Sequence, residues 1–123
     1  MNTLFLIAGG LSALVCLIHV ILGGRGAARP LLNAKSLHTM PRMTNYYCWH
    51  LVTIALALMS VGYFLSARVG AATDGAILAT AFAVLAALLC FGINVRWSLK
   101  HIQHPQWVLF APIAGLGLAG IYA

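Results

Sequence analysis

The sequence is poor in acidic side chains. It has no glutamate and one aspartate, Asp74, against 7 lysines and arginines. This scarcity excludes a carboxylate-bridged di-iron site and a paired-carboxylate glycosidase, and it argues against a proton-coupled transporter that needs a membrane carboxylate. The chain also lacks a glycine-rich loop ending in Lys-Ser or Lys-Thr, and no serine has a visible His/Asp setting. We therefore expect a binding or assembly protein more than an enzyme.

Charged residues of either sign are also scarce. They make up 7% of the chain, whereas 63% of the residues are hydrophobic, and a soluble domain usually has about 25% charged residues. So few polar side chains cannot cover a water-exposed surface, which predicts a membrane protein. The net charge of +6 is spread over loops between apolar segments, so we expect no nucleic-acid partner. The three cysteines lie in or beside apolar segments and do not resemble a disulfide framework.

Four apolar segments organise the chain into one predicted domain, residues 1–123. They cover residues 4–24, 46–66, 75–98 and 106–122. A membrane-spanning helix needs about 20 residues, within a range of about 17–25, and backbone groups in lipid must bond within their own segment. The sequence therefore predicts an all-α, integral-membrane four-helix bundle.

Glycine and proline mark the expected helix boundaries. Gly23, Gly24 and Gly26 are predicted to end the first helix. Pro105 is predicted to begin the fourth helix and to force His104 out of helical geometry.

The positive charges predict the orientation. Loops on the cytoplasmic side carry an excess of lysine and arginine, so we expect both termini outside and the first and third loops in the cytoplasm, in contact with anionic lipid. The first loop contains Arg25, Arg29, Lys35 and Arg42, the third contains Arg96 and Lys100, and the second contains only Arg68.

The reactive side chains gather toward the predicted cytoplasmic ends of the helices. His19 lies about five residues, or about 7 Å, from the inner end of the first segment, and His50 lies at a similar depth in the second. Cys90 and Asn94 approach the inner end of the third segment, and His101 follows it. Small and polar residues favour helix–helix interfaces in lipid, and here they form three stripes at helical spacing. The stripes are Gly9, Ala13, Cys16 and His19; Tyr46, His50, Thr53, Ala57 and Ser60; and Cys90, Asn94, Trp97 and His101.

These stripes predict a polar pocket near the inner leaflet. His19 and His50 are suited to bis-histidine ligation of haem b, and sulfur together with imidazole suits copper or zinc. Asn94 would orient an imidazole. The competing interpretation is that the histidines only form hydrogen bonds across the bundle. The candidate metal ligands are His19, His50, Cys16, Cys90 and His101.

Aromatic and cationic residues extend the predicted pocket. Trp49 and Trp97 provide flat surfaces for a haem or a quinone, and Arg96 is suited to a propionate or phosphate group. The alternatives are an aromatic belt at the membrane interface and a snorkelling arginine anchor.

Two segments carry a resemblance to other sequences. Residues 46–53, Tyr-Tyr-Cys-Trp-His-Leu-Val-Thr, and residues 104–110, His-Pro-Gln-Trp-Val-Leu-Phe, resemble segments of small four-helix inner-membrane proteins of proteobacteria. The resemblance implies a location in the bacterial inner membrane and implies no activity. The four-span plan is also similar to that of small multidrug transporters and fluoride channels, but the membrane glutamate of the former and the entry and pore motifs of the latter are missing.

Three functions remain open at this point. The first is a membrane protein that binds a metal ion or haem for electron transfer or cofactor handling. The second is a non-catalytic accessory or assembly subunit of a larger membrane complex, or a homo-oligomer. The third is a transporter or channel for a small solute, with histidines as titrating gates.

Overall fold

The computed structural model describes residues 1–123, and the chain is helical apart from its turns. Three continuous helical stretches are long and apolar enough to cross a membrane, and the last helix is a shorter apolar one of 17 residues. The predicted all-α class with four helical rods is confirmed, and these lengths indicate a membrane protein. The elements are α1 (Thr3–Ile18), the π-helix η1 (His19–Ala28), α2 (Arg29–Leu32), α3 (Thr39–Val69), α4 (Asp74–Arg96) and α5 (Gln106–Tyr122).

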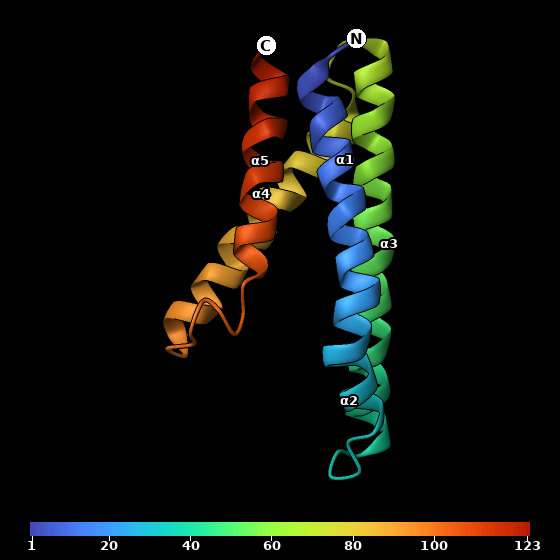
Figure 1. Cartoon of the computed structure of the whole chain (residues 1–123), viewed down its shortest axis with the longest axis vertical. Coiled ribbons are helices and arrows are strands. Elements are labelled where there is room, and N and C mark those ends of the chain that lie inside the picture. Colours follow the sequence, from blue (N-terminus) through green and yellow to red (C-terminus); the bar gives the residue numbers. More distant parts are fainter.

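The rods form two antiparallel hairpins. The continuous rod α1–η1–α2 runs along α3, and α4 packs against α5 (Figure 1). Both termini lie at one end of the molecule, which we call the terminal end (Figure 1). The opposite end, which we call the basic end, holds the connections 33–38 and 97–105 and six of the seven lysines and arginines. The hairpins pack together near the terminal end and diverge toward the basic end (Figure 1).

The first rod is longer than the sequence predicts. The expected stop at Gly23, Gly24 and Gly26 is wrong, because the chain continues through them as η1 and reaches Leu32. In lipid, a backbone group freed by a helix break has no water to bond, so glycine stays helical there more readily than in water. Pro30 lies in the first turn of α2, a position where a missing N–H is tolerated. The π-helix that results is a rare form often found at functional sites.

The remaining boundaries agree to within a few residues at most ends. α3 begins at Thr39, seven residues before the predicted start at 46, and ends at Val69. Gly70 follows with a φ of 81°, the left-handed conformation usual after a helix. α4 ends at Arg96 instead of residue 98, and Ser98 follows with a φ of 51°. This turn removes His101 from the helical face that carries Asn94, so the third predicted stripe is only partly formed.

Hydrogen bonds from buried or partly buried side chains join neighbouring helices toward the terminal end. One of them joins two of the predicted stripes, on α1 and α3. In lipid such bonds add to close packing, which supplies most of the helix association. The bonds are Tyr63 Oη with Thr80 Oγ1 (3.0 Å), Ser60 Oγ to Gly9 O (3.0 Å) and Asn2 Nδ2 to Gly120 O (3.2 Å).

Gly62 brings α3 into backbone contact with α4. A methyl group at Gly62 would lie 2.9 Å from the backbone oxygen of Gly75, and a backbone atom cannot move aside cheaply. We expect Gly62→Ala to lower the free energy of unfolding by about 1–3 kcal/mol, measured by denaturant titration in detergent. Gly92→Ala is the matched control, because a methyl group there meets no atom within 4 Å. Equal stability of the two variants would contradict the close crossing of α3 and α4.

Candidate functional site

The predicted metal ligands are divided between the two hairpins. Cys16, His19 and His50 lie on the first hairpin, whereas Cys90 and His101 lie on α4 and the connection that follows it. The structure gathers no group of three or more His, Cys, Asp or Glu side chains that would hold a metal ion. Because the hairpins diverge toward the basic end (Figure 1), the side chains form two separate polar clusters instead of one ligand set.

The first cluster is built on the contact between His19 and Trp49. His19 begins η1, and its ring stacks on the Trp49 indole of α3 with centroids 4.6 Å apart and planes inclined by 21°. His19 Nε2 lies 3.1 Å from the backbone oxygen of Trp49. A carbonyl only accepts, so Nε2 carries the proton and Nδ1 presents a lone pair. No group of the protein donates to this Nδ1.

His50 and Cys16 do not join His19 around a common point. The exposed His50 ring contacts Trp49 edge-on at 5.0 Å and Tyr46 at 4.5 Å. Both imidazoles therefore contact Trp49, His19 by stacking and His50 in a T-shaped arrangement, and bis-histidine ligation of haem stays a prediction. The Cys16 thiol faces the backbone oxygen of Thr53 at 3.7 Å. Hydrogen bonding across the hairpin, the competing interpretation, describes His19 but not His50.

Gly23 leaves space beside two unpaired polar atoms. A methyl group at Gly23 would lie 3.6 Å from Trp49 Nε1 and 3.8 Å from His19 Nδ1. Trp49 Nε1 is the one buried side-chain nitrogen or oxygen without a hydrogen-bond partner. A buried unpaired N–H costs about 1–3 kcal/mol, and such groups are rare in native proteins. An unpaired donor and an unpaired acceptor in this arrangement match a hydroxyl group, which both accepts and donates.

His19 and Gly23 border a groove between the two hairpins. Its volume is about 450 Å³, within the range of about 300–1,000 Å³ that is usual for ligand sites. The lining is mostly apolar, and Gln106 on the facing hairpin is its second polar side chain. Such a groove, apolar with few polar groups, is typical of a site for an amphipathic molecule. The apolar walls include Val15, Ile18, Leu22, Val52, Leu56, Leu109 and Phe110.

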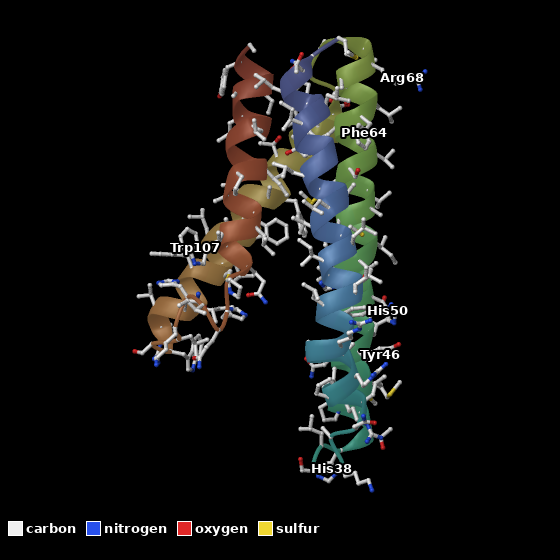
Figure 2. The ribbon with its side chains drawn as sticks, in the orientation of Figure 1. His38, Tyr46, His50, Phe64, Arg68 and Trp107 are labelled. Carbon is white, nitrogen blue, oxygen red and sulfur yellow. The ribbon has the colours of Figure 1, made fainter.

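The second cluster is centred on Asn94, whose side chain is 1% exposed. Asn94 Nδ2 donates to His101 Nδ1 (3.2 Å) and to the backbone oxygen of His104 (2.9 Å). Asn94 Oδ1 accepts from His104 Nδ1 at 2.7 Å, and Trp107 Nε1 donates to His101 Nδ1 at 2.9 Å. The sequence predicts that Asn94 orients an imidazole, and the imidazoles it contacts are those of His101 and His104. Figure 2 shows Trp107 on this hairpin, apart from Tyr46 and His50 on the other.

The hydrogen bonds of this cluster assign both tautomers. His101 Nδ1 accepts from two donors, so the proton is on Nε2, whereas His104 Nδ1 donates and leaves Nε2 with a lone pair. Cys90 Sγ lies 3.5 Å from His104 Nδ1. Every atom of Asn94 that can form a hydrogen bond here does so. The cluster therefore fixes the 97–105 connection against α4.

Arg96 and Trp97, predicted as cofactor contacts, are exposed at the end of α4. The guanidinium carbon of Arg96 lies 5.2 Å from the centroid of the Trp97 ring, a cation–π contact. Because α4 ends at Arg96, Trp97 does not extend the face that carries Cys90 and Asn94. The two residues pair with each other and line neither cluster.

The predicted site residues omit several contributors to the clusters. Gly23 lies four residues after His19, a spacing that places both residues on one helix face and so indicates their proximity. His104 and Trp107 flank Pro105, and the sequence predicts that His104 leaves the helix but not that its ring returns to Asn94. The omitted residues are Gly23, His104, Gln106 and Trp107.

The comparisons with known proteins give no family for this chain. No protein-family model matches it, and no significant match is found among curated proteins or solved structures. Only the arrangement of the side chains therefore bears on function.

Proposed function

We propose that this chain is a small bacterial inner-membrane protein that binds an amphipathic, hydroxyl-bearing ring compound of the quinol class in the groove between its hairpins. One observation carries the proposal: His19 Nδ1 and the buried Trp49 Nε1, which form no hydrogen bond within the protein, lie near the position that a Gly23 side chain would occupy, and His19 and Gly23 line the groove. A quinol hydroxyl accepts from the indole N–H and donates to the imidazole.

The rest of the groove suits the remainder of such a ligand. Leu56, Leu109 and Phe110 provide apolar surface for a ring and an isoprenoid chain, and the amide of Gln106 offers a hydrogen bond from the facing hairpin. With the basic end in the cytoplasm, as the positive-inside rule indicates, the groove lies near the inner leaflet. A ligand dissolved in the bilayer then enters sideways from lipid.

Haem b is the second candidate ligand, favoured by the unprotonated ring nitrogen of His19 beside the groove. His19 would be its protein ligand at the groove, since His50 does not line the groove. A copper or zinc centre is not proposed, because it needs three or more ligands and the side chains do not assemble them.

Extraction of the purified protein tests the proposal. We expect quinone in organic extracts of the wild type, identified by mass spectrometry, and about tenfold less from His19→Leu, because one hydrogen bond of about 1–1.5 kcal/mol is lost. His50→Leu is the matched control, since His50 is exposed and does not line the groove. A Soret band in the wild-type protein would identify the ligand as haem and not as a quinol. Extracts without either compound, or equal losses from both variants, would overturn the proposal.

A further inference from the structure

A second groove, of about 500 Å³, lies on η1, α2 and α3 at the basic end. Its polar lining comes from Arg25, Arg29, Asn33 and Tyr46, and apolar residues such as Val20 and Ile21 complete it. Figure 2 shows Tyr46 on α3 near this end. Two guanidinium groups and an apolar surface therefore line the same groove.

The positive charge of this groove has no counterpart in the chain. The one acidic residue, Asp74, begins α4 beside the terminal end, away from this groove. Arg25 and Arg29 form no ion pair, and neither they nor the side chains of Asn33 and Tyr46 form a hydrogen bond within the protein. The groove therefore offers several donors and has no internal acceptor for them.

The aromatic wall of this groove is the Trp49 indole, which lies against the π-helix. Arg25 lies within η1. Arg29 is the first residue after η1, and its backbone N–H donates to Gly24 O. A methyl group at Gly24 would lie 3.9 Å from the Trp49 ring, so Gly24 and the indole lie next to each other in the lining of the groove. An anion that binds here meets guanidinium groups and an apolar wall together.

We infer that this groove binds an anionic phospholipid, with phosphodiester oxygens on Arg25 and Arg29 and the start of an acyl chain on Val20 and Ile21. Guanidinium groups bind phosphate oxygens with two parallel hydrogen bonds. Basic pockets between membrane helices on the cytoplasmic side are typical sites for lipid headgroups. The apolar half of the lining favours a lipid over a free phosphate ion.

Native mass spectrometry with added phosphatidylglycerol tests this inference. Arg25→Gln/Arg29→Gln is compared with Lys35→Gln/Arg42→Gln, which removes the same charge from the same end but outside the groove. We expect the first pair to weaken lipid binding at least about tenfold, since hydrogen bonds to a charged group contribute about 1.5–3 kcal/mol. The second pair, together with Arg68→Gln at the opposite end (Figure 2), should change binding much less.

Three results would overturn the inference. Equal weakening in the two double variants would mean diffuse attraction to anionic lipid. Equal binding of phosphatidylcholine would remove the requirement for an anionic headgroup, and displacement of the lipid by millimolar inorganic phosphate would assign the site to a free anion. If Arg25→Gln/Arg29→Gln fails to fold, Tyr46→Phe removes only one hydroxyl and should still weaken binding about threefold to tenfold. Unchanged binding in that variant would also count against the site.

Discussion

Replacement of Asn94 by leucine is expected to lower the free energy of unfolding by about 2–4 kcal/mol and to release the 97–105 connection from α4. Leucine is similar in size but forms no hydrogen bonds, so the Nδ1 proton and backbone oxygen of His104 lose their partner. Each buried polar group left unpaired costs about 1–3 kcal/mol. Denaturant titration measures the stability, and hydrogen exchange in residues 97–105 measures the release.

Asn45→Leu is the control for this substitution. Asn45 is exposed, and its side chain bonds only to Pro41 O within the same helix, at 2.8 Å. We expect a change in stability within about 0.5 kcal/mol, as for most surface substitutions. If Asn94→Leu behaved like Asn45→Leu, the Asn94 cluster would not hold the hairpin closed.

Gly23→Leu is expected to weaken ligand binding about 100-fold while the helices stay folded. The first carbon of the new side chain fits, since it lies at ordinary contact distance from Trp49 Nε1 and His19 Nδ1. The rest of the leucine occupies the groove beside both atoms, where the ligand hydroxyl would lie. Loss of two hydrogen bonds of about 1–1.5 kcal/mol each corresponds to about 100-fold weaker binding. Titration of the ligand-free protein with a short-chain quinol, followed by tryptophan fluorescence, measures this affinity.

Gly26→Leu provides the matched comparison for the groove. Gly26 lies in the same π-helix, and a side chain there meets no atom within 4 Å. Both variants carry the same change in helix propensity, so they differ only in whether the groove is filled. We expect Gly26→Leu to bind like the wild type, and a similar loss of affinity in both variants would attribute the effect to η1 itself.

The helices were the more predictable part of this structure. Long apolar runs predict four rods because lipid leaves the backbone no other way to satisfy its hydrogen bonds, and α5 (Gln106–Tyr122) has the predicted bounds. The predicted helix end at Gly23 and Gly24 is wrong, because glycine interrupts helices less readily in lipid than in water. The stripes on α1 and α3 do face each other, as the bond from Ser60 Oγ to Gly9 O demonstrates.

The site was less predictable, because depth along a helix does not determine direction around it. His19 and His50 have similar predicted depths, yet Trp49 contacts both and they do not contact each other. Cys90 and His101 are separated from them by the divergence of the hairpins, a tertiary property that no local pattern encodes. The turn at Ser98 then determines that Asn94 contacts His101 and His104 instead.

Photoaffinity labelling with an azidoquinone tests most directly whether the groove between the hairpins is the ligand site. In the folded wild-type protein, we predict labelled peptides from both walls, residues 15–23 and residues 105–110, and little labelling in Gly23→Leu. Labelling confined to lipid-facing residues such as Leu85 and Leu88, which are exposed on α4, and unaffected by Gly23→Leu, would contradict the proposed site.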